Sequence, residues 1–281
     1  METLKEYFET IPSLHRSLII AGGLFFFYLI EYVIPYSTLS YRKAGHAGIN
    51  IIFTMTTAVV NFALAFLIVW ACDYVVANKI GLLFILPLPV WAFVLTGLLL
   101  FDLIGAWLVH FLQHKIKWMW KFHLVHHTDT YVDATTANRH HPGESVFRFS
   151  FTVIAVLVSG APIWLVMLYQ SLSVLLAQFN HANINISDKL DKVLSFFIVS
   201  PNMHKIHHHF QQPYTDSNYA NIFSVWDRLF GTFRTMDKSK LIYGIDTHME
   251  PVEITNLKNL MTIPFQKYRS PEGSKFEGEV V

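Results

Sequence analysis

Residues 90–127 read VWAFVLTGLLLFDLIGAWLVHFLQHKIKWMWKFHLVHH, an apolar run that passes into a histidine-rich one. Residues 90–109 are apolar apart from Thr96 and Asp102, and they match the roughly 20 residues that a membrane-spanning helix needs. The rest of the stretch carries five histidines among lysines and tryptophans. It therefore predicts a membrane helix that runs directly into a histidine-rich region at the membrane surface.

Other apolar stretches lie on both sides of this one. Residues 18–36 and 49–77 precede a central span that we expect at 80–109, and residues 146–179 follow it. The last stretch has Gly160-Ala-Pro162 at its middle, so it forms either one long tilted helix or two short helices that turn there. We favour the hairpin, because it returns the histidines on both flanks to the same membrane face.

The predicted fold is an all-α integral membrane protein with about three spanning helices, a helical hairpin and a cytosolic helical cap that carries the histidines. We expect transmembrane helices in residues 1–109, a histidine-bearing catalytic region in 110–235 that includes the hairpin 146–179, and a polar tail in 236–281. Basic residues flank the spans on the histidine side, and the positive-inside rule places that side in the cytoplasm. Counting back over three spans places the amino terminus on the opposite face.

The composition also indicates a membrane protein. Of the 281 residues, 53% are hydrophobic and 15% are charged, whereas soluble domains carry roughly a quarter charged residues. The net charge of +1 argues against nucleic acid as a partner. Cys72 is the single cysteine of the sequence, which excludes an intramolecular disulfide and any metal site built from cysteines.

Histidine is the anomaly of this composition, with fifteen residues, twelve of them between positions 110 and 209. His110 and His114 have an i, i+4 spacing that places both rings on one helix face. The spacing HxxHH then occurs twice, in His123, His126 and His127 and in His204, His207 and His208. On a helix, the first histidine of HxxHH and one of the last two can bind the same metal centre. The remaining histidine is then left to bind a neighbouring centre.

Imidazole nitrogens suit zinc, copper, iron and nickel. Eight spaced histidines exceed the three or four ligands of a single zinc site, so two metal ions are the economical interpretation. The site could be a di-iron oxygen-activating centre, a zinc-dependent enzyme site or a metal-transport path. Transport would need ionisable groups within the spans, where Glu31, Asp73 and Asp102 lie. The clustering of histidines at one end of the spans favours a fixed catalytic site.

Two further motifs accompany the histidines. Arg139-His-His-Pro-Gly-Glu144 follows the first HxxHH, and a segment from Asp216 to Thr232, DSNYANIFSVWDRLFGT, follows the second. With the histidine pattern, these motifs give residues 90 to 235 a resemblance to the fatty acid hydroxylase and sterol desaturase superfamily of membrane di-iron oxidoreductases. Some fatty acyl hydroxylases have a histidine four residues after the counterpart of His181, where this chain has Asn185. This departure favours the sterol-desaturase-like branch; Asn185 either binds metal through water or caps the next element.

The resemblance implies a set of iron ligands and an activity. His141 matches the family's His-Pro element and His181 its lone histidine before the last motif. Two iron ions would use O2 and two external electrons to hydroxylate or desaturate a C–H bond of a lipid in the bilayer, such as a sterol or fatty acyl lipid. The ten implied ligands are His110, His114, His123, His126, His127, His141, His181, His204, His207 and His208.

Several partners and neighbours follow from the same sequence. No dinucleotide or haem motif is evident, so we expect a separate electron donor, such as a cytochrome b5-like protein, a ferredoxin or a reductase. Asp102 either orients a ligand imidazole or pairs with another helix. Candidates for positions beside the ligands or on the surface are Asp129, Asp133, Glu144, Asp227, His140 and His209. We expect His15, His46 and His248 at the surface, and Trp118, Trp120 and Phe122 in an interfacial aromatic belt.

Overall fold

A computed structural model describes residues 2–37, 43–274 and 276, and this part of the chain is helical, with isolated β-bridges. Five of its helical segments are long and apolar enough to cross a membrane. They are α2 (Ser13–Val33), α3 (Lys43–Asn78) with the short α4 (Leu82–Ile85), the continuous run of α5 (Val90–Phe101), η1 (Asp102–Leu108) and α6 (Val109–Lys115), then α8 (Pro142–Ser159) and α9 (Ile163–His181). The all-helical membrane fold expected from the sequence is confirmed.

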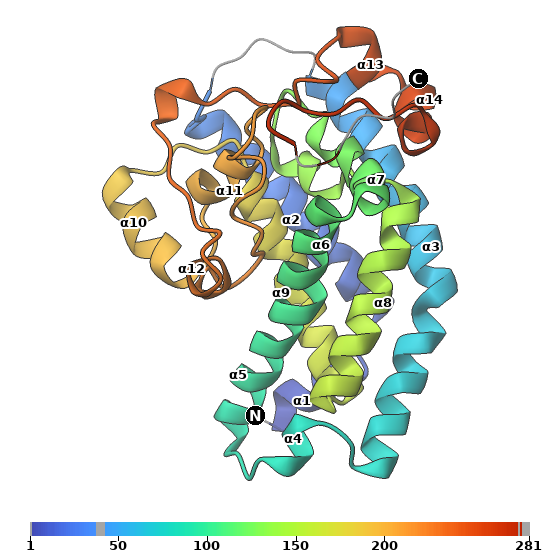
Figure 1. The fold of residues 1–281 in the computed structure, drawn as a ribbon. Coiled ribbons are helices and arrows are strands. Elements are labelled where there is room, and N and C mark those ends of the chain that lie inside the picture. The colour runs from blue at the N-terminus through green and yellow to red at the C-terminus, as the bar shows by residue number, and fades with distance from the viewer. Residues whose placement is uncertain (1, 38–42, 275, 277–281) are drawn as a thin grey trace.

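These segments run up and down in a bundle (Figure 1). The amino-terminal helix α1 (Glu2–Glu9) lies at the end of the bundle that is far from the cap, where it packs against α9. At the middle, Gly97 of α5 lets the span approach α9 closely, because a Cβ atom there would lie 2.4 Å from Leu165. Phe101, Val156 and Leu165 are fully buried in this core, while large apolar side chains face outward elsewhere on the bundle.

The hairpin predicted within 146–179 is present, as helices α8 and α9 with bounds a few residues wider. Gly160 ends α8 in the left-handed conformation, with φ of 77°, and Pro162 is the residue that precedes α9. A side chain at Gly160 would also meet the carbonyl oxygen of Ile80 at 2.3 Å. The Gly-Ala-Pro sequence therefore turns the chain where a single tilted helix would have continued.

The lipid-facing character of the outer helices agrees with a multi-pass membrane protein. On α2, Phe25 and Phe26 are exposed, and on α3 the exposed side chains include Val59, Phe62 and Phe66. Side chains of this size would be unfavourable in water across such a continuous surface, whereas hydrocarbon tails solvate them.

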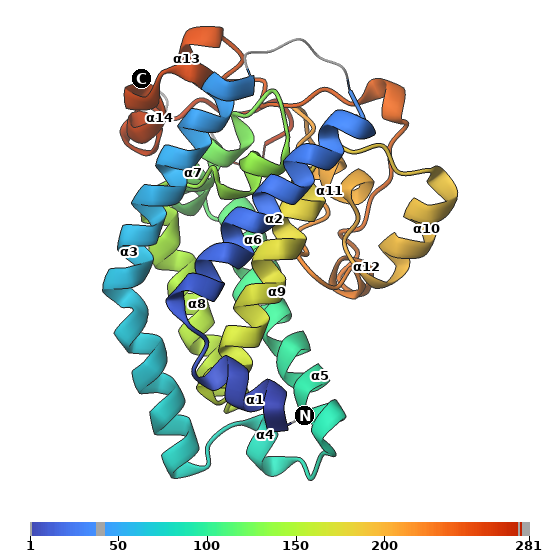
Figure 2. The ribbon, with the colours of Figure 1, turned by 180° about the vertical axis from the view of Figure 1, so that it is seen from behind.

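A cap of short helices closes one end of the bundle (Figures 1 and 2). The tail joins this cap: Leu260, Ile263 and Tyr268 pack in a cluster with Trp120 and Val125. The predicted domain limits stay a prediction. The cap consists of α7 (Lys117–His127), η2 (Ala134–Asn138), α10 (Asp188–Phe197), α11 (Pro201–His207), α12 (Val225–Leu229), η3 (Lys238–Lys240), α13 (Pro251–Thr255), α14 (Leu257–Thr262) and η4 (Ile263–Phe265).

Candidate metal centre

Four helix segments bring the histidines together where the bundle meets the cap. The end of the third span, α6, carries His110 and His114, and α9 ends at His181. Helices α7 and α11 carry the two HxxHH patterns, with His208 directly after α11. The π-helical turn η1 lies immediately before α6, and such turns within α-helices are frequent at functional sites.

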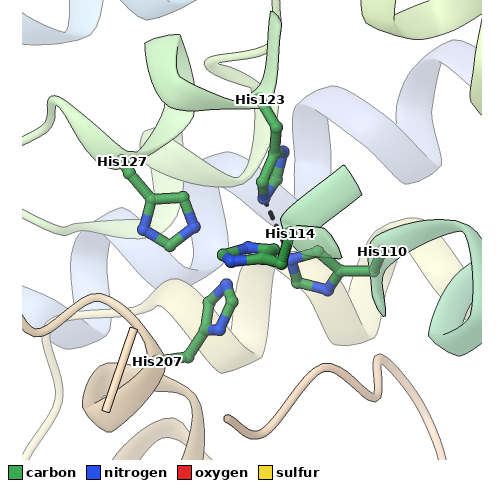
Figure 3. A group of neighbouring side chains, drawn as sticks. All are labelled: His110, His114, His123, His127 and His207. Carbon is green, nitrogen blue, oxygen red and sulfur yellow. Dashed lines mark hydrogen bonds between the residues drawn. The ribbon is translucent and has the colours of Figure 1, made fainter. Parts of the chain in front are cut away.

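The first group of side chains comprises five buried histidines: both from the HxxxH pattern, two from the first HxxHH and one from the second. At least one ring nitrogen of each lies within 4.8 Å of one from every other member. Figure 3 shows the rings of this first group turned toward a common centre, with the Nε2 atoms of His110 and His123 3.0 Å apart. Its members are His110, His114, His123, His127 and His207.

The second group comprises four buried histidines that meet by the same criterion. The Nε2 atom of His181 lies 3.2 Å from that of His126 and 3.0 Å from that of His204. His208 completes the group, and its ring centroid lies 5.0 Å from that of His127 in the first group. The two groups are therefore adjacent, in contact through neighbouring rings.

In three of the rings, the nitrogen that faces outward donates to a backbone carbonyl. His110 Nδ1 donates to the carbonyl of Tyr219 at 2.7 Å, and His207 Nδ1 donates to that of Ser217 at 2.7 Å. His181 Nδ1 donates to its own helix, at the carbonyl of Ala177. A carbonyl oxygen only accepts, so each of these rings carries its proton on Nδ1 and directs the lone pair of Nε2 inward.

The nitrogens that face inward fit metal ions. Within the described part of the chain, the Nε2 atoms of His114 and His207 and both ring nitrogens of His127 and His208 are buried without a hydrogen-bond partner. Buried polar atoms are normally paired, and a metal ion accepts several lone pairs at once. Where two Nε2 atoms lie about 3 Å apart and both carry lone pairs, a shared cation removes their repulsion. The donor set is all imidazole, which suits iron, zinc or copper.

Burial keeps the cap histidines neutral, which is the form that binds metal. Desolvation lowers the pKa of His123 to about 3, although Glu144 opposes this shift. Burial and the neighbouring imidazoles hold the pKa values of His127, His204 and His207 well below the usual range for histidine.

Carboxylates hold two of the first-group rings from outside. Glu144, at the start of α8, accepts from His123 Nδ1 at 3.0 Å, from His140 Nδ1 at 3.1 Å and from Arg148 Nε at 2.7 Å. Asp216 accepts from His114 Nδ1 at 3.2 Å and pairs with Lys115. Metal-bound histidines usually have such partners, which fix the tautomer and the ring orientation.

Two other carboxylates position the segment whose carbonyls hold His110 and His207. Asp102 accepts from the backbone N–H groups of Ile222 and Phe223 at 3.0 and 2.9 Å. Asp227 accepts from the N–H groups of Tyr219 and Ala220, both at 2.9 Å. The Asp102 carboxylate is therefore bonded to backbone N–H groups rather than to a ligand imidazole.

The structure does not bring His141 into either group. His141 caps α8, accepting from the N–H of Gly143 at 3.0 Å on Nδ1, and its Nε2 donates to the carbonyl of Met261 at 3.2 Å. Its neighbour His140 lies at the site instead, with its ring stacked on His126 at a centroid distance of 4.4 Å. The preference for proline in the first helical turn is the sequence signal that marks His141 as the cap before Pro142.

Several expected positions differ in the structure. Trp120 is buried against His114 and His127, with ring centroids 4.8 and 5.3 Å apart, so it is not part of an interfacial belt. Its i, i+3, i+7 relation to His123 and His127 could have revealed that shared helix face. His46 is not a surface residue, because it bonds to Asp129 at 2.8 Å, across the cap.

Other positions lie outside both groups. Asn185 is exposed, and its backbone N–H donates to the carbonyl of Ile34 at 2.8 Å, so its side chain lies away from the histidines. His248 is buried rather than exposed, and His15 is exposed as expected. His209 accepts on Nδ1 from the N–H of Ile242 at 3.2 Å, outside the two groups.

A model of the fatty acid hydroxylase family matches residues 94–232, the part of the chain that contains every histidine of the two groups. Residues 94–232 of the chain belong to the fatty acid hydroxylase family. Membership of this family confirms the superfamily resemblance drawn from the motifs, and the sterol-desaturase-like branch stays a prediction. No solved structure matches the chain.

Curated relatives within the family act on different lipids, according to their names. The chain is 32% identical over 161 residues to an alkylglycerol monooxygenase of Xenopus tropicalis, which covers 53% of the chain and 33% of the relative. It is 26% identical over 130 residues to an ornithine lipid hydroxylase of Rhizobium tropici, covering 46% and 38%. It is 30% identical over 136 residues to a cholesterol 25-hydroxylase-like protein of Danio rerio, covering 48% and 53%. The chain spans between a third and about half of the length of these relatives.

Proposed function

We propose that this fatty acid hydroxylase family protein is a di-iron, O2-dependent lipid oxidoreductase that hydroxylates, or desaturates, a C–H bond of a membrane lipid. The observation that carries the proposal is the pair of adjacent histidine groups, five and four residues, whose inward nitrogens are buried and either face one another or have no hydrogen-bond partner within the described residues. Named lipid hydroxylases and monooxygenases among the relatives support the reaction class.

The first group would hold one iron ion and the second group the other, with His140 beside the second group. Iron ions at these positions would supply the chemistry of O2 activation and C–H oxidation, with two electrons from a separate donor. This proposal keeps nine of the ten ligands expected from the motifs and replaces His141 by His140 as a neighbour of the centre.

The protein's own residues orient and enclose this centre. The carbonyls of Ser217 and Tyr219 hold His207 and His110 in one tautomer, and Glu144 does so for His123. Trp120 and Tyr219 pack against first-group rings, so they exclude water from the side on which they lie. A dry surrounding of this kind protects a reactive centre from side reactions.

Two of the three intramembrane acids argue against a transport path. Glu31 accepts from the backbone N–H groups of Ala134 and Asn183, at 2.7 and 3.0 Å, and pairs with Lys43 at 2.9 Å. Asp102 is occupied by backbone N–H groups in the same way. These carboxylates hold loops of the cap, whereas a conduit needs acids that are open to a passing ion.

Substrate, donor and orientation complete the proposal. We place the lipid substrate, a sterol or an acyl lipid, in the bilayer around the spans. We place the cap on the cytoplasmic side. There a cytochrome b5-like protein, a ferredoxin or a reductase would supply electrons. Basic residues beside the cap support this orientation through the positive-inside rule.

Metal content per chain tests the proposal. Protein purified in detergent from iron-supplemented cells should contain two iron ions per chain. His207→Ala in the first group and His208→Ala in the second should each lower that number, whereas the exposed His15→Ala should leave it unchanged. Stable loading of zinc alone, after attempted iron reconstitution, would contradict the di-iron assignment. Lipid products that appear without O2 would contradict the oxygenase.

A further inference from the structure

An exposed apolar surface lies on the cap beside the bundle, at the adjoining ends of α10 and α12. We call it the tip patch. Its side chains are each between 42% and 66% exposed, although all are large and apolar. The tip patch consists of Val193, Phe196, Phe197, Val225, Leu229 and Phe230. Exposed large apolar side chains that gather in this way mark an interaction site.

The position of the tip patch indicates what covers it. In Figures 1 and 2, α10 and α12 lie beside the bundle, level with α6 and α9 rather than beyond their ends. The ring of Phe230 stacks on Trp107 of the third span at a centroid distance of 4.3 Å. The tip patch therefore lies directly against the third span.

All four charged side chains of α10 lie in its first half. Its first turns carry Asp188, Lys189, Asp191 and Lys192, and its last turn ends in Phe196 and Phe197. The charged end lies toward the top of the cap and the aromatic end toward the bundle (Figure 1). Interfacial helices keep charged side chains in the headgroup layer and bury their apolar residues below it.

The charged side chain of Arg228 at the tip patch limits how deeply the patch can lie in a membrane. Arg228 donates to the carbonyl of Ser195 at 2.8 Å, and its guanidinium lies over the ring of Phe233 at 3.9 Å. The residue is exposed, so its charge would be costly at the bilayer centre, while lipid phosphates accept it at the headgroup level. Gly231, with φ of 71°, then turns the chain back toward the cap.

We propose that the tip patch inserts into the lipid leaflet on the cap side of the membrane, with Arg228 at the level of the phosphates. The site is a binding surface for the bilayer itself, in addition to the five spans. A backbone hydrogen bond connects the tip patch to the candidate metal centre. The N–H of Val199, just after α10, donates to the carbonyl of Ile222 at 2.9 Å, and Ile222 belongs to the segment that Asp102 holds. Lipid in this leaflet would thus lie beside the segment that orients His110 and His207.

Site-directed spin labelling of the full chain in phosphatidylcholine nanodiscs tests this placement. Cys72 is buried and is first replaced by alanine, and a single nitroxide is then attached to Phe197→Cys or Leu229→Cys. We expect collisions with O2, which concentrates in lipid, to exceed those with a water-soluble nickel chelate at both positions. The matched control Lys189→Cys, at the charged end of the same helix, should show the reverse.

The outcomes distinguish whether lipid, water or protein lies against the tip patch. Predominant collision with the nickel chelate at both tip positions would overturn the proposal, because the tip patch would then face water. Protection from both reagents would overturn it as well, because protein, such as a second copy, would cover the surface. Two independent tip positions guard against one label that disturbs folding. The measurement needs neither iron nor activity, so its result is independent of the proposed reaction.

Discussion

Replacing Glu144 by glutamine probes how the protein holds its histidines. The carboxylate is fully buried and accepts from His123, His140 and Arg148, with two of these donors on Oε1 and one on Oε2. A glutamine keeps one acceptor oxygen, and the least disruptive orientation retains it at the Oε1 position. The amide nitrogen then faces His140 Nδ1, where it cannot accept, and the bond to His123 loses its charge.

The magnitude follows from these changes. A hydrogen bond to a charged group contributes about 1.5–3 kcal/mol and a neutral one about 0.5–1.5 kcal/mol, so His123 loses roughly 1.4 kcal/mol of support. That difference corresponds to about a tenfold loss of metal affinity at the first group, at the lower end of the roughly 10–100-fold found when such outer partners are removed. Glu144→Ala, which leaves all three donors without an acceptor, should approach the upper end.

Competition with a chelator of known affinity measures the effect on purified protein. The control is Glu253→Gln, whose carboxylate pairs with Arg269 at 2.7 Å outside both histidine groups, and it should bind metal like the parent. If Glu144→Gln folds and keeps metal affinity within about twofold of the parent, the carboxylate does not support His123 as argued.

Three further predictions concern the same centre. His140→Ala should weaken metal binding at the second group more than His141→Ala, because the ring of His140, unlike that of His141, stacks on a histidine of the group. Equal effects of the two substitutions in chelator competition would contradict this. Asp227→Asn should lose the bond to the N–H of Ala220, cost about 2 kcal/mol and lower metal retention on heating, whereas the exposed Asp73→Asn should not. Burial lowers the folded-state pKa values of the cap histidines, so below pH about 6.5 the unfolded chain binds more protons. Acidification below this pH should lower the free energy of unfolding of the metal-free protein by about 1.4 kcal/mol per pH unit and histidine, which a falling melting temperature would show.

The membrane helices and the hairpin could be predicted because their signals are local. A run of apolar residues of spanning length needs no tertiary information, and Gly160 with Pro162 ends one helix and begins another through backbone geometry alone. The approximate bounds of the spans were predictable for the same reason. The packing of the polar tail on Trp120 was not, because it depends on contacts between segments over a hundred residues apart.

The candidate site could be predicted as a list but not as an arrangement. Helical spacing identifies rings that share a face, and it does not say which partner helix they meet. Asp102 illustrates the limit: a buried acid two turns before His110 is placed correctly for a ligand partner, yet the π-helical turn and the approach of Ile222 direct it to backbone N–H groups. His140 and His141 are likewise neighbours in sequence, and helix capping separates their roles.

The two histidine groups share the residues of each HxxHH pattern, and helix geometry explains this spacing. Successive residues of a helix point about 100° apart, so the last two histidines of each pattern lie on either side of the first. On α7, the i, i+4 pair His123 and His127 joins the first group, and His126 joins the second.

On α11 the division is reversed: the i, i+4 pair His204 and His208 joins the second group, and His207 joins the first. Each helix therefore contributes to both groups, and neither group can form unless both helices are in place. A single HxxxH on each helix would leave the two groups free to form separately. The additional histidine in each pattern places both helices at both candidate metal positions.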